Sequence, residues 1–497
     1  MAETVSPRHG LAPWVAALLV FLSSGAVLVL ELSALRLLAP YLGLTLEMST
    51  AVIGVALAAI AFGTWVGGRA ADRVDPARAL GPLLLAAGVL TWLVLPAVRG
   101  VGEASRGQDV SLVLLMSMLT LFVPAALLSA VTPMVIRLEL RSLDRTGSVV
   151  GRLSAVGTLG ALVATFGTGF VLFALVPTSR ILIVLGGLLV VAGLALLAWQ
   201  RRAAPLAAGV AAAVAAGVLA QLAPDPCDVE TRYHCARVDT EASSGRVLVL
   251  DRLRHSYVDL ADPTHLEFAY VRAVAAGIDA AYPDGRPLDV LHLGAGGLTL
   301  PRYLEATRPG STGLVLEIDE GVPDLVRDAI APGPAGVQVR IQDARLGLAG
   351  SPTGTYDVVV GDAFGSVAVP WHLATREAVV EVRRTLTPGG LYALNVIDQP
   401  PLALLRAEVA TVAHVFPHVA LVSDRPTLAG EDGGNAVVLA SDEPLPLERL
   451  EALVEQRDPD QAVLTGDGLA AFVGGASVLT DDLAPVDQLL TPYVLER

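Results

Sequence analysis

Lysine is absent from this chain of 497 residues, so each of its 34 fixed basic side chains is an arginine. Cysteine is nearly absent, and only Cys227 and Cys235 occur. Charged residues make up 17% of the chain, whereas hydrophobic residues make up 53% and the mean hydropathy is +0.60. This composition excludes a wholly water-soluble protein of this length. We therefore expect part of the chain to lie in a lipid bilayer.

The charge is divided unevenly between the two parts of the chain. Residues 1–222 hold 14 arginines and 9 acidic residues, which leaves 20 arginines and 40 acidic residues of the totals of 34 and 49. The first part therefore carries a net charge of about +5 and the second about −20. An acidic surface repels phosphate groups, which argues against nucleic acid and anionic lipid as partners of the second part.

Seven apolar stretches occur in the first part, and each is long enough to cross a hydrocarbon core of about 30 Å. They cover residues 14–38, 48–66, 80–98, 110–136, 152–176, 180–199 and 205–222. The first is too long, and too soon followed by the second, to be a cleaved signal peptide. The sequence therefore predicts a multi-pass membrane protein, with the lipid bilayer as a partner.

Arginine counts predict the orientation of this membrane region. The connections after the second, fourth and sixth stretches contain nine arginines, and the alternate connections contain three. The richer set is expected in the cytoplasm. With seven crossings, everything after Leu222 then lies outside, where Cys227 and Cys235 could pair in an oxidising environment. Two alternatives stay open: the cysteines are unrelated thiols, or the weak seventh stretch does not cross and the second part lies inside.

The second part alternates strand and helix signals. Residues 231–260 have the apolar–polar alternation of a small antiparallel sheet. Seven strands are then expected at 289–293, 314–319, 337–343, 356–362, 391–398, 418–423 and 436–440, with helices at 298–307, 321–330, 371–386 and 401–415. This order predicts a doubly wound, Rossmann-like α/β domain of methyltransferase type, ending in an antiparallel hairpin. We expect three regions: a transmembrane helical domain at 1–222, a linker and small sheet at 223–262, and the Rossmann-like domain at 263–497.

Polar residues at the expected strand ends predict a nucleoside site. Gly294 and Gly296 give the first strand a tight turn into a helix, with exposed backbone N–H groups. Glu317 closes the second strand and could accept hydrogen bonds from ribose hydroxyls, and Asp343 closes the third and could accept from an adenine amino group. Asp362 ends the fourth strand, where it could act as a base or steady a sulfonium charge. The alternative is that these carboxylates cap helices or form turns.

Six segments resemble the spermidine synthase (polyamine aminopropyltransferase) family in order and spacing. They read GRVLVLDRLRHSYVDLADPTHLEFAYVR, VLHLGAGGLTLPRYL, LVLEID, QDARL, YDVVVGDAF and LTPGGLYALNV. The whole chain looks most like the membrane-fused branch of that family. The resemblance implies decarboxylated S-adenosylmethionine as co-substrate, no metal, Glu317 and Asp343 as nucleoside ligands, and Asp362 as the catalytic carboxylate. It also makes a second copy of the chain a candidate partner.

The chain departs from the family pattern at positions that would face ammonium groups. Gly297 stands where the family has an aspartate, and the segment Asp362 to Gly365 lacks the second aspartate of the family's DxxD motif. Tyr270 is kept, but Arg272 replaces its acidic partner, and His255 stands at a usual glutamine beside the donor. An ammonium without a paired carboxylate is costly to bury. Arg272 would suit an acceptor with a carboxylate or phosphate group.

Three functional hypotheses follow from these residues. The first is a membrane-anchored transferase that uses decarboxylated S-adenosylmethionine or S-adenosylmethionine and acts on a small molecule that need not be a polyamine. The second is a non-catalytic sensor or regulatory cap on a transport-like bundle; it draws on Glu31 within the first apolar stretch and on Gly67 to Arg73, which resembles a loop of major facilitator transporters. The third is a methyltransferase, which Gly297 permits because no carboxylate there would repel the methionine carboxylate.

Overall fold

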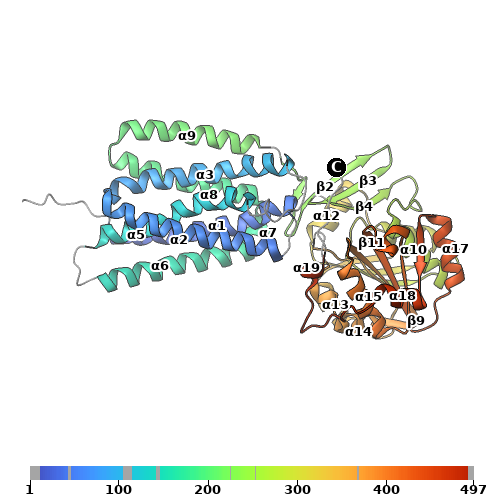
Figure 1. The fold of residues 1–497 in the computed structure, drawn as a ribbon. Coiled ribbons are helices and arrows are strands. Elements are labelled where there is room, and N and C mark those ends of the chain that lie inside the picture. The colour runs from blue at the N-terminus through green and yellow to red at the C-terminus, as the bar shows by residue number, and fades with distance from the viewer. Residues whose placement is uncertain are drawn as a thin grey trace, which may run out of the picture. The chain divides into compact units, whose positions relative to one another are not determined.

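The computed structural model describes residues 12–42, 46–104, 115–140, 146–223, 225–251, 253–365 and 369–490. The described residues divide into two compact units, one up to Asp225 and the other from Pro226 onward (Figure 1). Each unit has a hydrophobic core of its own.

The first unit is a bundle of helices. Seven helical segments of the described residues are long and apolar enough to cross a membrane, as predicted. The elements are α1 (Pro13–Leu42), α2 (Leu46–Arg73), α3 (Pro76–Ala104), η1 (Met118–Phe122), α5 (Val123–Glu139), α6 (Thr146–Phe166), η3 (Gly167–Leu172), α7 (Phe173–Leu175), α8 (Thr178–Trp199) and α9 (Ala203–Leu222). Two of them, η1 and η3, are π-helical turns that continue directly into α5 and α7.

Glycines allow pairs of helices in the bundle to approach closely. A Cβ atom on Gly63 of α2 would lie 2.1 Å from the carbonyl oxygen of Ala126 in α5, and one on Gly160 of α6 would lie 2.2 Å from that of Phe21 in α1. Lipid tails are as apolar as leucine, so transmembrane helices associate through such close packing rather than through the hydrophobic effect. Any side chain at either glycine would therefore separate its helix pair.

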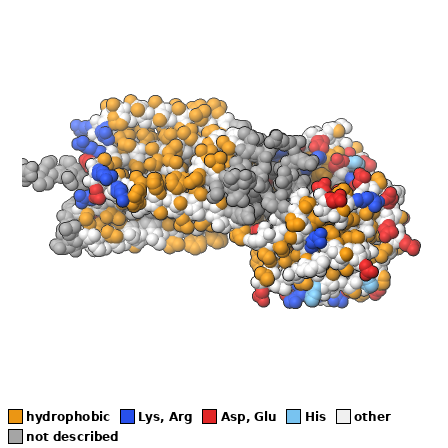
Figure 2. Space-filling model, viewed as in Figure 1, with side chains coloured by type: hydrophobic (Ala, Val, Ile, Leu, Met, Phe, Trp, Pro, Cys, Tyr) orange, Lys and Arg blue, Asp and Glu red, His pale blue; other side chains and the backbone are white. Residues whose placement is uncertain are grey.

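The outer surface of the bundle is apolar along the helices and basic at one end. Figure 2 shows hydrophobic side chains covering the helices, with arginines gathered at one end. That end holds the junctions of α2 with α3 and of α5 with α6, where Arg78, Arg137 and Arg152 are about half exposed or more. This clustering agrees with the arginine distribution in the sequence, and the side of the membrane on which it lies stays a prediction.

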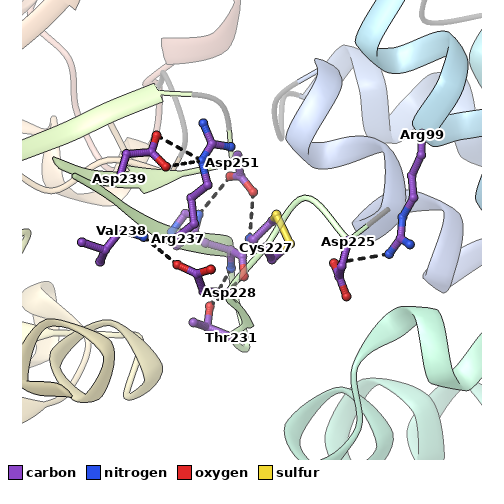
Figure 3. The surroundings of a disulfide bond; sticks show 11 residues. Arg99, Asp225, Cys227, Asp228, Thr231, Arg237, Val238, Asp239 and Asp251 are labelled. Atoms are coloured by element: carbon purple, nitrogen blue, oxygen red, sulfur yellow. Dashed lines mark hydrogen bonds and ion pairs between the residues drawn. A yellow bond between two sulfur atoms is a disulfide. The ribbon is translucent and has the colours of Figure 1, made fainter. Parts of the chain in front are cut away.

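The second unit begins with a small antiparallel sheet, as expected. Its strands lie in the order β1 (Val229–Glu230), β2 (Cys235–Glu241), β3 (Gly245–Leu250) and β4 (Leu253–Asp259). Cys227 and Cys235 form a disulfide across the loop that contains β1, which confirms their expected pairing (Figure 3).

A mixed eight-stranded sheet follows, which confirms the predicted fold class. Its order is β12-β10-β11-β9-β8-β5-β6-β7; the strands from β7 to β9 are parallel, and β11, β10 and β12 are each antiparallel to the preceding neighbour. The strands are β5 (Asp289–Leu293), β6 (Thr312–Glu317), β7 (Val337–Ile341), β8 (Tyr356–Gly361), β9 (Leu386–Asp398), β10 (His418–Asp424), β11 (Gly434–Ser441) and β12 (Gln461–Leu464).

One expectation about this sheet was wrong. The hairpin of β10 and β11 does not end the sheet, because β12 pairs with the far edge of β10. Strand β12 has four residues, too few to show an alternating pattern in the sequence. The link inside the hairpin also contains a short helix, α16 (Arg425–Ala429).

Helices cover both faces of the large sheet (Figure 1). One core contains side chains of α10 (Ala269–Ala281), α11 (Thr299–Thr307) and α17 (Leu447–Arg457). The other contains side chains of α13 (Ala344–Gly350), α14 (Arg376–Thr385), α15 (Ala403–Val415), α18 (Gly466–Val473) and α19 (Val486–Leu489), with the 3-10 turn η4 (Trp371–Leu373) beside them. Helix α12 (Gly321–Ala329) shares a third core with the small sheet. The small sheet is therefore anchored next to the carboxyl ends of β5 and β6.

Candidate active site

A cavity of about 720 Å³ opens at the carboxyl ends of β5, β6 and β8. Its size is typical of small-molecule sites, and its position is where doubly wound sheets bind their ligands. All eight site residues predicted from the sequence line it. They are His255, Tyr270, Arg272, Gly294, Gly296, Glu317, Asp343 and Asp362.

The glycine-rich turn forms one wall of the cavity. Gly294 and Gly296 have φ angles of +101° and +46°, which favour glycine. A Cβ atom on Gly294 would lie 2.4 Å from the carbonyl oxygen of Asp362, so a side chain there would force β5 and β8 apart. The turn passes into α11 through Leu298, which is left-handed as well.

Glu317 ends β6, and main-chain amides hold its carboxylate. Oε2 accepts a hydrogen bond from the N–H of Ala295 at 2.9 Å, and Oε1 accepts one from the N–H of Asp319 at 2.9 Å. Burial raises the pKa of Glu317, and these two hydrogen bonds oppose that rise. Each carboxylate oxygen can still accept a further hydrogen bond on the side that faces the cavity.

Asp343 lies two residues beyond β7 and serves two purposes. Its Oδ1 accepts a hydrogen bond from the N–H of Leu346 at 3.1 Å and so caps α13. The nitrogen Nε2 of His372 lies 3.1 Å from its Oδ2. The helix-capping alternative is therefore correct for Asp343, although the same side chain also lines the cavity.

Asp362 follows β8 and is held by two side chains. The hydroxyl of Tyr270 donates to Oδ2 at 3.1 Å, and Nδ2 of Asn395 donates to Oδ1 at 2.8 Å. Burial raises the pKa of Asp362 to about 6, against the effect of these two donors. Asn395 was not predicted; an amide among the apolar residues of β9 was the only available signal. Its own Oδ1 accepts from Nδ2 of Asn435 at 3.0 Å.

Two histidines line the cavity beside the small sheet, and His234 is buried whereas His255 is partly buried. His255 was predicted, and its Nε2 has no hydrogen-bond partner among the described residues. Burial, together with the nearby His234, lowers the pKa of His255 to about 4. His234 was not predicted; its Nδ1 lies 3.0 Å from Oδ2 of Asp251, and the two imidazole rings are 6.4 Å apart.

Arg272 lines the cavity, but other protein groups engage its guanidinium. Nη2 lies 2.5 Å from Oδ2 of Asp458, and Nη1 donates to the carbonyl oxygens of Leu266 and Glu267. Asp458 follows α17 and lies 186 residues further along the chain. Sequence reasoning did not identify this pair, because nothing local to Arg272 indicates its partner.

Gly297 packs directly against β4. Its N–H donates to Oγ of Ser256 at 2.8 Å, and a Cβ atom on Gly297 would lie 2.9 Å from Cβ of Ser256. An aspartate at this position would therefore require β4 or the turn to move.

Among the described residues, no group of three or more His, Cys, Asp or Glu side chains is arranged to hold a metal ion.

Comparisons with known proteins agree with this architecture. No family model matches the chain. It is 31% identical over 152 residues to the polyamine aminopropyltransferase of Vibrio vulnificus strain CMCP6, which covers 30% of this chain and 49% of the relative. It is 32% identical over 128 residues to a probable polyamine aminopropyl transferase of Bifidobacterium longum strain NCC 2705, which covers 25% and 28%. The chain thus spans half or less of the length of the curated relatives it matches.

Two solved structures are similar to part of the chain. A probable spermidine synthase from Corynebacterium glutamicum ATCC 13032 aligns with 53% of this chain and 98% of its own, with 27% identity and a TM-score of 0.48. The spermidine synthase of Thermotoga maritima aligns with 52% of this chain and 81% of its own, with 17% identity and a TM-score of 0.35. The sheet order and the strand-end cavity define a methyltransferase-type α/β domain. Within that class the chain is spermidine synthase-like, as its motifs predicted.

Proposed function

We propose that this protein is a membrane-anchored transferase that binds an adenosyl sulfonium donor and transfers an alkyl group to a small acceptor. The donor is decarboxylated S-adenosylmethionine or S-adenosylmethionine. The single observation that carries the proposal is that all eight residues singled out from the sequence line one cavity of about 720 Å³. These residues come from four strand ends, strand β4 and helix α10, so sequence proximity does not explain their meeting.

The donor is placed by the residues at the carboxyl ends of β5, β6 and β7. The positive φ angles at Gly294 and Gly296 leave the turn without side chains, so a nucleoside can approach the backbone. Glu317 is fixed by two amides and accepts the ribose hydroxyls with its remaining lone pairs. Asp343 accepts from the adenine amino group, and His255 borders the donor from the small sheet.

The transfer step uses Asp362 as the base. The lone pair of the acceptor attacks the carbon next to the sulfonium, the carbon–sulfur bond breaks, and its electron pair neutralises the sulfur as a thioether leaves. The proton lost from the acceptor goes to the Asp362 carboxylate. A pKa of about 6 keeps this carboxylate ionised at neutral pH yet basic enough to take a proton. Tyr270 and Asn395 hold it in place.

The acceptor side supports a substrate other than the usual polyamines. Gly365 stands where the family motif has a second aspartate, and Gly297 is packed against Ser256. Arg272 adds no carboxylate, and its charge is offset by Asp458. A polyamine would bury ammonium groups here with fewer carboxylates than the family supplies, which costs several kcal/mol per unpaired ion.

Direct binding tests the donor assignment. We expect the purified full-length protein in detergent to bind methylthioadenosine, S-adenosylmethionine or its decarboxylated form in titration calorimetry. Binding of at least one of these adenosyl ligands, competed by the others, supports the proposal. Failure to bind all three at concentrations up to a few millimolar would contradict it.

A non-catalytic sensor remains the second candidate. The observation in its favour is the neutralised Arg272 together with the missing acceptor-side carboxylates. If the protein is a sensor, expression of the Asp362→Asn variant in a strain that lacks the gene fully restores the normal phenotype. A transferase instead requires the ionised carboxylate, so the same variant fails to complement.

We also propose that the second unit lies outside the cytoplasm. The Cys227–Cys235 disulfide and the arginine-rich end of the bundle support this orientation. An impermeant thiol reagent applied to intact cells should label the two cysteines only after reduction. Labelling that requires permeabilised cells would place the unit inside.

A further inference from the structure

The disulfide-closed segment Cys227–Cys235 contacts the donor side of the cavity through its side chains. Thr231 and His234 both lie within it, and His234 lines the cavity. Figure 3 shows Thr231 and Asp251 beside the disulfide. We propose that this segment is a positioning element that holds Glu317 ready for the ribose, acting through Thr231 and Asp319. This inference rests on the proposed function, because it assigns a role to a residue that binds the proposed donor.

A continuous set of hydrogen bonds joins the segment to Glu317. The hydroxyl of Thr231 accepts from the N–H of His234 at 2.8 Å and donates to Oδ2 of Asp319. The other carboxylate oxygen of Asp319 accepts from the N–H of Gly321 at 3.1 Å. The N–H of Asp319 in turn donates to Oε1 of Glu317. Asp319 is 1% exposed, so a lost donor would leave a buried carboxylate under-coordinated.

Close packing fixes the same contact. A Cβ atom on Gly321, the first residue of α12, would lie 2.6 Å from Cγ2 of Thr231. The segment therefore lies directly on the start of the helix that follows Glu317. On its other side, Asp251 accepts from the N–H of Cys235 at 3.1 Å and contacts Nδ1 of His234. The segment is thus tied both to the small sheet and to the turn that carries Glu317.

The disulfide supplies the stability that the segment lacks by itself. Strand β1 has two residues, and its register with β2 covers only Val229 with Ala236 and Glu230 with Cys235. Strand β1 lies at the edge of the small sheet, so only this short pairing with β2 holds it there. The cross-link joins residues eight apart and restricts the conformations of the open segment. Without it, Thr231 would leave Asp319 more often, and the turn that orients Glu317 would loosen.

The test compares ribose recognition in variants of the full-length protein in detergent. The probes are methylthioadenosine and its 2′-deoxy analogue, measured by titration calorimetry below the unfolding temperature of each variant. We expect the wild type to prefer the ribose ligand by about tenfold, because a hydrogen bond to a carboxylate is lost in the analogue. Thr231→Val and the double variant Cys227→Ser/Cys235→Ser should bind the ribose ligand about tenfold more weakly. Both should also reduce the ribose preference to about twofold.

Two further variants separate positioning from general destabilisation. Thr231→Ser keeps the hydroxyl and should restore both affinity and preference. Thr312→Val removes a threonine hydroxyl that donates to Asp289 at the opposite end of β6, and should leave both unchanged. An unchanged ribose preference in Thr231→Val, or an equal loss in Thr312→Val, would overturn the positioning role while leaving the proposed function intact. A wild type that binds neither probe would remove the proposed function itself.

Discussion

The two sides of the cavity hold their carboxylates in different ways. On the donor side, the main chain supplies hydrogen bonds to Glu317 and to Asp343. On the acceptor side, Asp362 is held by the side chains of Tyr270 and Asn395. Main-chain donors are fixed once the strands and turns are formed, whereas side-chain partners change with every substitution. The fold therefore determines the geometry of the donor side, whereas the acceptor side can be altered without moving a strand.

The departures from the spermidine synthase pattern fall on both sides of the cavity. Arg272 lines the acceptor side of the cavity, where a substitution changes charge while the strands keep their places. Gly297 lies on the turn. Ser256 fills the space beside it, and the N–H of Gly297 donates to Oγ of Ser256. The residues of the proposed nucleoside site are thus kept, whereas those proposed to face the acceptor differ from the family pattern.

The largest expected effect is on turnover in Asp362→Asn. The amide cannot take the acceptor proton, so turnover should fall by about 10³-fold, within the usual range for loss of a general base. Donor affinity should change by less than about threefold, because the donor contacts of the other side are unchanged. Single-turnover assays and calorimetry on the same preparation measure the two quantities. Asp284→Asn, at an exposed loop residue, is the matched control. A parallel loss of donor binding would mean that the two sides are not separable.

The next largest effect is on donor affinity in Glu317→Ala. This variant removes the acceptor for both ribose hydroxyls and should weaken binding by about 100-fold, as expected for two hydrogen bonds to a charged group. Glu451→Ala, on the exposed face of α17, should have no effect. Asp343→Ala should reduce affinity less, about tenfold, and should also lower stability by about 1 kcal/mol because it removes a helix cap. Equal affinity in Glu317→Ala and wild type would remove the nucleoside assignment.

The donor side could be predicted from the sequence for a physical reason. In parallel strands the carboxyl ends meet at one edge, so Gly294, Glu317 and Asp343 were expected together, with Asp362 of the acceptor side beside them, once the strand periodicity was recognised. The seven apolar stretches were equally clear, because each is long and apolar enough to cross a membrane, and the structure forms a helix at each of them.

The remaining features depend on contacts between distant residues. Asn395 and Asp458 are paired with residues 33 and 186 positions away, and no local pattern indicates either partner. Strand β12 was missed because four residues carry too little periodicity. Likewise, Asp319 carries no sequence signal for its contact with Thr231, which depends on the disulfide-closed loop.

A pH titration should change turnover and stability in opposite directions, and the effect on turnover is about tenfold per pH unit. With a pKa of about 6 for Asp362, turnover should fall about tenfold for each pH unit below 6 and level off above it. Stability should move in the opposite direction. The folded-state pKa is raised above the ordinary value of 3.8, so the associated stability is complete below pH 3.8 and is lost as pH rises through 6. Asp362→Asn should therefore be more stable than wild type above pH 6, by up to about 3 kcal/mol. A wild-type turnover that does not change between pH 5 and 7 would contradict the base assignment.

The smallest effect is expected for the pair of Arg272 and Asp458. If the guanidinium of Arg272 stays paired with the carboxylate of Asp458, Arg272→Met and Asp458→Asn should each lower the free energy of unfolding. The double variant should then show a coupling energy of about 1 kcal/mol between the two residues. The side chains are 27% and 12% exposed, so solvent screens part of the attraction. Donor affinity should stay within about twofold in all three variants, because the pair lies on the acceptor side. A coupling near zero, together with a large change in acceptor KM for Arg272→Met alone, would instead show that Arg272 leaves Asp458 to bind an anionic acceptor.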